Sequence, residues 1–530
     1  MFTTSELEAK YEVITAENSK LVALVSELKA QNETLQHHLY LMRHARFGRK
    51  SEKDIVAEQL SLQFDEADDT TLALEATETS ESETITYTRS KKGQGRHKLP
   101  ESLPYIEKIH DLCEAEKQCA CGCTLTHIGE ERSEQLDVIP QMTFRVVHIR
   151  KKYACKQCEE TIQLAKFPKQ PLPKSMASAG LLAAVIDAKF NRHMPLYRQE
   201  DMFKRAGIPM TRATLSHWMI KSADLLMPLV KLMEDIIQNH DIAYADETPL
   251  QVLKEKGQKA TSKSYMWLFM GGPPDKRSFI YTYAPSRANH IALDFFEDFR
   301  GYLHADCYSA YVALGKSGPV THVACMAHAR RYFVEVTRLT KKKKGLAFQI
   351  VEHIAKLYSL EKTLKEENAT PEHIKHIRET QAVPILEQIK KLLDDNVIKV
   401  PSQGPLAKAV NYMLNHWDAL NHYLKDGRLE IDNNRAERAI KPFVIGRKNW
   451  LFHGNDIGAR AGGILFSMIE TCKEHHVDTF SWLKHTLNHI QEADTVEKLE
   501  QLLPFNVKPE HLEAARSMPE LIFPDKKADN

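Results

Sequence analysis

The chain has 530 residues and a formal net charge of +1, from 72 lysines and arginines against 71 aspartates and glutamates. A chain of this length is too long for one hydrophobic core, so roughly three or four structural units are expected. The balanced charge excludes a uniformly basic surface, so any affinity for nucleic acid must come from local patches. No apolar run is long enough to span a membrane and no secretory leader is evident, which predicts a cytoplasmic protein without a membrane partner.

Residues 1–45 carry an apolar heptad pattern. Apolar side chains recur at every seventh position, at Leu7, Ile14, Leu21, Leu28, Leu35 and Met42. This spacing predicts an N-terminal coiled coil, and the polar Asn18 and Asn32 favour a parallel homodimer or a higher homo-oligomer. A helix that packs on its own chain is the alternative. The acidic, Ser/Thr-rich stretch 46–88 has no periodic apolar face and is predicted to be a disordered linker.

Residues 89–168 combine a basic segment with two clusters of cysteines. The first cluster is a Cys-x-Cys-x-Cys triplet and the second a Cys-x-x-Cys pair, formed by Cys119, Cys121, Cys123, Cys155 and Cys158. Four thiolates at this separation fit a structural Zn²⁺, which would stabilise a small unit with few large apolar residues. Which two cysteines of the triplet bind the metal stays open. A set of free buried cysteines is the alternative to a zinc-binding module.

Residues 169–238 show helical periodicity. A helix at 196–205, a break containing Gly and Pro, and a second helix at 211–220 that opens on the capping Thr211 match the spacing of a helix-turn-helix. The region is therefore predicted to bind DNA, with an ordinary helical hairpin as the alternative. The candidate groove contacts are Arg212, Thr214, Ser216 and His217.

Residues 239–338 contain apolar, strand-like segments. Strands are expected at 241–252, at 265–270, at 279–283, in a segment ending at Asp306 and at 320–326, with a helix at 288–299 before the fourth strand. Three strands, helix, strand, helix, strand is the order of a ribonuclease-H-like α/β core. A helical insertion at 339–429 separates this first part from a second part at 430–490, and 491–530 is expected as a C-terminal tail. The fold class is thus multidomain α+β.

Three acids recur in this region as candidate metal ligands. Asp246 and Asp306 each stand next to the end of a predicted strand, and Glu437 lies in a stretch rich in Arg, Lys and Asn. Alternation along the first strand puts Tyr244 and Asp246 on one face and Glu247 on the other, which favours Asp246 and leaves Glu247 as the substitute.

The stretch around Glu437 also has a simpler interpretation. Asp432 could cap a helix that begins near Asn433, and Glu437 could form an exposed pair with Lys441 one turn later. The other two acids favour a cleft instead. Three carboxylates gathered there would repel one another unless cations neutralised them. Hard oxygen ligands suit Mg²⁺ or Mn²⁺, and a metal pair can activate an attacking oxygen and stabilise a leaving one.

In combination, five segments resemble the insertion-sequence 66 family of bacterial DDE-type transposases. They are 245–248, 304–308, 325–331, 432–442 and 446–450. The resemblance covers nearly the whole chain and implies Asp246, Asp306 and Glu437 as the catalytic triad. The compressed first cysteine cluster departs from the usual knuckle. The role of Cys325 and His328 does not follow from the sequence, and as an isolated pair they are expected to serve packing and hydrogen bonding.

The resemblance implies cleavage and joining of double-stranded DNA at terminal inverted repeats, with possible help from small accessory proteins of the same element. Basic side chains expected to contact DNA are Lys91, Lys92, Arg96, Arg212, Arg435, Arg447 and Lys448. Two other functions remain open at this stage. One is a DNA-binding regulator with an inert ribonuclease-H-like core, and the other is a stand-alone nuclease.

Overall fold

The computed structural model describes residues 143–144, 146–148, 152–154, 162–164, 169–339, 344–398, 400 and 403–517. The expected coiled coil, the linker, the basic segment at 89–98 and the five cysteines of the zinc-binding module lie outside these residues. Contacts divide the chain into two compact units, of which one spans Gln63–Phe167 and the other, larger one includes Pro168–Asn530. Within the described residues, no helix is both long and apolar enough to cross a membrane.

The unit that ends at Phe167 contributes one short hairpin. Strand β1 (Lys152–Ala154) pairs antiparallel with β2 (Ile162–Leu164), with Ala154 opposite Ile162. In the sequence, Cys155 and Cys158 fall between these two strands. The hairpin therefore brackets the second cysteine pair.

In the described stretch from residue 169 onward, three helices precede the sheet: α2 (Ala179–Phe190), α3 (Leu196–Arg205) and α4 (Arg212–Gln238). Thr211 caps α4 as expected, because its hydroxyl accepts the backbone N–H of Thr214 at 3.2 Å. Helix α4 continues well past the predicted end at residue 220. The reason is that buried apolar side chains recur at helical spacing as far as Ile237, so tertiary packing sustains the helix.

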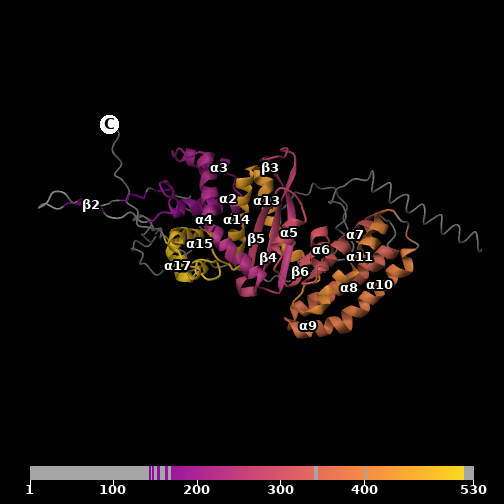
Figure 1. The fold of residues 1–530 in the computed structure, drawn as a ribbon. Helices are drawn as coiled ribbons and strands as arrows, with labels where there is room; N and C mark the ends of the chain where they lie inside the picture. Colours follow the sequence, from indigo (N-terminus) through magenta and orange to yellow (C-terminus); the bar gives the residue numbers. More distant parts are fainter. Residues whose placement is uncertain are drawn as a thin grey trace, which may run out of the picture. The chain divides into compact units, whose positions relative to one another are not determined.

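A mixed sheet forms the centre of the larger unit, which includes Pro168–Asn530 (Figure 1). Its strands are β3 (Ile242–Lys254), β4 (Lys263–Gly271), β5 (Ser278–Ala284), β6 (Gly301–Ala305) and β7 (Val320–Ala324). Their order is β5-β4-β3-β6-β7, and β8 (His453–Asn455) pairs with the far end of β3. Strands β3, β4 and β5 are antiparallel, whereas β6 and β7 run parallel to β3. Each predicted strand is present, with its ends shifted by a few residues.

Helices cover both faces of the sheet. The first face packs against α5 (His290–Phe295) and α6 (Ser309–Lys316), where the rings of Phe295 and Phe269 stack with centroids 4.0 Å apart. The opposite face packs against α13 (Asn434–Trp450) and α14 (Asp456–Glu474) through Phe443 and Phe466, whose rings contact Tyr281. Figure 1 shows α13 and α14 on the other side of the strands from α5 and α6. The segment with Glu437 is thereby set against the sheet.

Helix α14 also closes the exposed edge of β5. The backbone N–H groups of Phe279 and Tyr281 donate to the hydroxyls of Thr471 and Ser467 at 3.2 and 2.8 Å. Gly463 permits this approach, because a Cβ there would lie 2.4 Å from the carbonyl oxygen of Tyr281. Side-chain hydroxyls thus satisfy edge donors that would otherwise pair with another strand.

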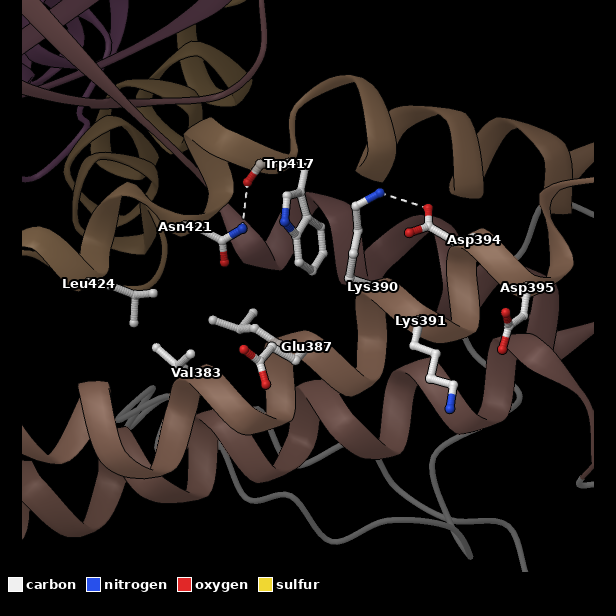
Figure 2. A pocket seen from close by; sticks show the side chains of 10 residues that line it. Val383, Glu387, Lys390, Lys391, Asp394, Asp395, Trp417, Asn421 and Leu424 are labelled. Atoms are coloured by element: carbon white, nitrogen blue, oxygen red, sulfur yellow. Dashed lines mark hydrogen bonds and ion pairs between the residues drawn. The ribbon is translucent and has the colours of Figure 1, made fainter.

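The expected insertion is helical throughout its described part. It follows α7 (Met326–Arg338) and comprises α8 (Leu346–Glu366), α9 (Pro371–Ile377), the π-helical turn η2 (Arg378–Ala382), α10 (Val383–Val397), α11 (Pro405–Asn415), α12 (Trp417–Asn421) and η3 (His422–Lys425). A hollow of about 530 Å³ lies in this bundle. Figure 2 shows side chains that line it, among them Trp417 and Val383. Its lining includes none of the three candidate acids.

The expected C-terminal tail carries structure in its described part. After α15 (Thr479–His489) come η4 (Ile490–Glu492), α16 (Val496–Glu500) and α17 (Pro509–Arg516). The side chains of Leu502 and Leu503 are buried, and the indole N–H of Trp482 donates to the carbonyl of Leu502 at 2.9 Å. A tail is therefore the wrong description of 491–517, because these leucines anchor the segment to α15.

Candidate active site

Asp246 and Asp306 are placed by the parallel pairing of β3 with β6. The register sets Ala243 opposite Leu303 and Tyr244 opposite His304. Continued by two residues, the same register brings Asp246 level with Asp306. Asp306 directly follows the end of β6, and Asp246 lies within β3 at the same level, so the two residues stand beside each other where β6 ends.

The two faces of β3 separate Asp246 from Glu247. Tyr244 and Thr248 share the side of Asp246, and α13 contacts both: the Arg435 guanidinium lies 5.9 Å from the Tyr244 ring, and Arg447 donates to the Thr248 hydroxyl at 3.2 Å. Asp246 is thus on the face that α13 covers, where Glu437 also lies.

Glu247 points to the opposite face and is held there. Its carboxylate accepts the hydroxyl of Tyr311 and the Nε–H of Arg287, each at 2.6 Å, and its side chain is only 3% exposed. Arg287 also approaches Asp306, at 3.8 Å, and lies over the Tyr308 ring at 3.9 Å. No signal in the sequence pointed to Arg287 or Tyr311, since neither belongs to a local pattern. Glu247 therefore has a neutralising partner of its own.

Burial and the charges of the neighbouring acids both affect the pKa of Asp246. Burial raises the pKa of Asp246 well above its ordinary value, and the negative charges of Glu247, Glu437 and Asp306 raise it further. Its Oδ1 accepts the neighbouring backbone N–H of Glu247 at 2.8 Å. A bound cation would stabilise this carboxylate in its ionised form.

Helix α13 begins beside Asp246. Its N-cap is Asn433, so the expected cap at Asp432 is off by one residue. Asp432 instead accepts the N–H of Asn434 at 3.0 Å and the hydroxyl of Tyr358 at 2.9 Å. The Asn433 side chain is free to reach across the sheet, and its Nδ2 donates to the carbonyl of Ala245 at 2.9 Å. This bond ties the start of α13 to the residue before Asp246.

Glu437 faces α7 instead of pairing with Lys441. Its Oε1 lies 3.5 Å from Nδ1 of His328, and its Oε2 lies 3.7 Å from Nη2 of Arg331. Its side chain is 28% exposed. The isolated interpretation of Glu437 as one half of a surface pair is therefore wrong, because contacts from a distant helix surround it.

The starts of α7 and α13 are joined at Cys325. The backbone N–H of Met326 donates to the carbonyl of Ile431 at 3.1 Å, and that of Asn433 donates to the buried Sγ of Cys325 at 3.2 Å. Ligand atoms of Cys325, His328 and Glu437 lie within 4.8 Å of one another. The expected hydrogen bonding of Cys325 is present, and the contact with Glu437 is what the sequence could not show.

The described residues that are predicted to contact DNA differ in how many contacts their side chains already make within the protein. Arg212 is 66% exposed, and its Nε lies 2.9 Å from Glu200 of α3. Arg435 lies between Tyr244 and Glu430, with 3.5 Å to the latter carboxylate, and Arg447 is bound to Thr248. Lys448 is exposed. Arg212 and Lys448 thus remain open to phosphate, whereas Arg435 mainly holds α13 on the sheet.

The raised pKa of Asp246 predicts a pH-dependent effect on stability. Since the folded protein binds this proton more tightly than the unfolded chain, the carboxyl favours folding below its unfolded pKa of about 4, and the benefit is lost as pH rises through the folded pKa. At pH ~8 without divalent metal, Asp246→Asn should therefore stabilise the fold, because it removes a negative charge that burial and the neighbouring acids disfavour in the folded protein. The gain should vanish well below pH ~4, where both states are protonated.

Urea unfolding at both pH values measures this, with exposed Asp275→Asn as the matched control. Mg²⁺ should raise the melting temperature of the unaltered protein more than that of Asp246→Asn. An equal Mg²⁺ effect on both would show that Asp246 does not hold the ion.

Comparisons with known proteins address the chain as a whole. The model described as "Transposase IS66 family" matches residues 174–461, which is more than half of the chain. Models for the zinc-finger binding domain of transposase IS66 and for the IS66 C-terminal element match 116–159 and 467–505. The model described as "Transposase C of IS166 homeodomain" matches 34–107. The first match contains all three acids, and the second contains both cysteine clusters.

The curated relatives come from one bacterium. The uncharacterized protein y4jD of Sinorhizobium fredii (strain NBRC 101917 / NGR234) is 34% identical over 425 residues, covering 77% of this chain and 81% of the relative. The uncharacterized protein y4qI of the same strain is 29% identical over 524 residues, covering 95% and 94%. No solved structure matches.

Proposed function

Because the chain belongs to the IS66 family of transposases, we propose that it cuts and joins DNA at the terminal inverted repeats of a bacterial insertion sequence. Its family domains indicate a transposase of the nucleotidyltransferase type, with DNA-binding and zinc-finger modules and a dependence on divalent metal. The observation that carries the proposal is the meeting of Asp246, Asp306 and Glu437, which come from two parallel strands and one helix.

The strand order supports a ribonuclease-H-like core. An antiparallel β5-β4-β3 meander continues into parallel β6 and β7, with helices on both faces, as in the order proposed from the sequence. The first acid, Asp246, lies within β3, and the second, Asp306, directly follows the neighbouring strand β6. Helix α13 then supplies the third acid after the helical insertion.

In the proposed mechanism, Asp246, Asp306 and Glu437 hold two Mg²⁺ or Mn²⁺ ions through carboxylate oxygens. When bound, such a pair would activate the attacking oxygen and neutralise charge on the leaving oxygen of the phosphodiester. Asn433 keeps the start of α13 beside Asp246, and so fixes the separation between helix and strand. Arg287 neutralises Glu247, which leaves the other acids to bind the metals.

Recognition of the DNA ends is assigned to other parts of the chain. The helix pair α3–α4 with Arg212, the zinc-binding module with Zn²⁺ on Cys155, Cys158 and two of the first three cysteines, and the basic segment at 89–98 would contact the repeats. The coiled coil at 1–45 would pair two copies so that both ends of the element are held together. Small accessory proteins of the element could assist assembly.

The proposal is tested with a duplex that carries the imperfect inverted repeats expected beside the gene. The full chain with Mg²⁺ should release a 3′-hydroxyl at the repeat end and transfer it into a second duplex. Ca²⁺ should support binding with little chemistry, because it accepts looser coordination. Cutting without joining would favour the nuclease. Firm binding without either reaction, with accessory proteins supplied, would favour the regulator.

A further inference from the structure

The contact between α7 and α13 contains two facing polar atoms that lack a hydrogen bond. Nδ1 of His328 and Oε1 of Glu437 are both buried and have no hydrogen-bond partner within the described part of the chain. They lie only 3.5 Å apart. Buried polar atoms are nearly always satisfied, so a pair that faces without bonding suggests that a third group belongs between them.

The third side chain at this place is a thiol. Sγ of Cys325 lies with the other two ligand atoms inside a 4.8 Å cluster. The backbone N–H groups of Asn433 and His328 both donate to this sulfur. These two bonds fix the position of the sulfur beside His328 and Glu437.

The distance between His328 and Glu437 matches the spacing of neighbouring ligands around zinc. Zn–S bonds of about 2.3 Å and Zn–N or Zn–O bonds of about 2.0–2.1 Å at tetrahedral angles set neighbouring ligand atoms roughly 3.3–3.6 Å apart. The distance between His328 and Glu437 is 3.5 Å, so this pair needs almost no movement. A thiolate with an imidazole selects Zn²⁺ over Mg²⁺, because Mg²⁺ prefers oxygen ligands alone.

We propose that Cys325, His328 and Glu437 form a Zn²⁺ site that is separate from the cysteine module and shares only Glu437 with the proposed Mg²⁺ pair. Binding replaces the thiol proton, which is released to solvent as the Sγ–Zn bond forms. Three protein ligands leave a fourth position for water.

The site has a regulatory consequence that rests on the proposed function. Glu437 is shared, and its carboxylate on Zn²⁺ would be withdrawn from Asp246 and Asp306. Micromolar Zn²⁺ should therefore inhibit strand cleavage in the presence of Mg²⁺, by competition for one carboxylate.

The test counts zinc bound to the full chain, without DNA or Mg²⁺, at buffered free Zn²⁺. The cysteine module should load equally in every variant, so the difference between variants reports this site alone. Cys325→Ser and His328→Gln should each bind about one Zn²⁺ per chain less than the unaltered protein, the loss expected for one site. Cys472→Ser removes another buried thiol and should lose none. Far-UV circular dichroism verifies that each variant is folded. If Cys325→Ser does not fold, His328→Gln tests the site in its place.

Unchanged zinc content in Cys325→Ser and His328→Gln would overturn the site and leave a hydrogen-bonded cluster. The regulatory consequence is tested by the inhibition of strand cleavage by Zn²⁺, measured relative to each variant's activity without zinc. In His328→Gln the inhibiting Zn²⁺ concentration should rise at least about tenfold, the scale for loss of a ligand or of its supporting contact. Inhibition of equal strength in this variant would overturn the regulatory consequence. Failure of strand transfer in the unaltered protein would refute the proposed function while leaving the zinc count informative.

Discussion

Asp246→Ala, Asp306→Ala and Glu437→Ala should each reduce strand cleavage and joining by on the order of 10⁴-fold, the scale for removal of one member of a catalytic set. In the proposed mechanism each carboxylate would complete a shared metal site, so the two that remain would not hold the ions in place. The double change of Asp246 and Glu437 should be little worse than either single one. Binding to the repeats, measured by fluorescence anisotropy, should persist, because the acids contact metal and not DNA.

Two variants serve as controls for this loss. Glu247→Gln keeps an acceptor for the hydroxyl of Tyr311 on the opposite face of β3, and Asp432→Asn keeps an acceptor at the start of α13. Both should retain much more activity than the alanine variants. Full activity in Glu437→Ala would show that this residue is not catalytic and would refute the proposed mechanism.

Arg378→Ala should destabilise the fold by about 3–5 kcal/mol, the cost of leaving one partner of a buried ion pair alone. The Arg378 side chain is 2% exposed and forms a bidentate ion pair with Glu361, with distances of 2.8 and 2.6 Å. It also donates to the carbonyls of Tyr423, Asp426 and Leu429 at 2.8–3.0 Å. Loss of the Arg378 side chain would leave one carboxylate and three carbonyls without this hydrogen-bond donor.

The effect should extend to catalysis, because the carbonyls that Arg378 binds belong to the segment leading into α13. Urea unfolding followed by tryptophan fluorescence measures the change in free energy. Arg205→Ala is the matched control: its ion pair with Asp201 is exposed and should contribute at most about 1 kcal/mol. Equal losses in the two variants would mean that the buried network does not anchor the insertion.

Much of the catalytic unit follows from local patterns in the sequence. Apolar runs between Gly and Pro turns located all five strands from β3 to β7, and alternation along β3 assigned Asp246 and Glu247 to opposite faces. Thr211 marked the start of α4 because capping depends only on neighbouring residues. The end of α4 did not follow, because packing against the rest of the unit decides how far a helix continues.

The sequence by itself determined the strands, the acids as candidates and the family, since strand periodicity, capping and motif spacing are properties of short segments. Only the tertiary structure decided which groups surround each acid. Arg287 and Tyr311 hold Glu247, Asn433 binds beside Asp246, and Cys325 and His328 face Glu437. These residues lie tens to more than a hundred positions from their partners, and no local period records such a distance. Their meeting depends on how α7 and α13 pack on the sheet, which is a property of the whole core.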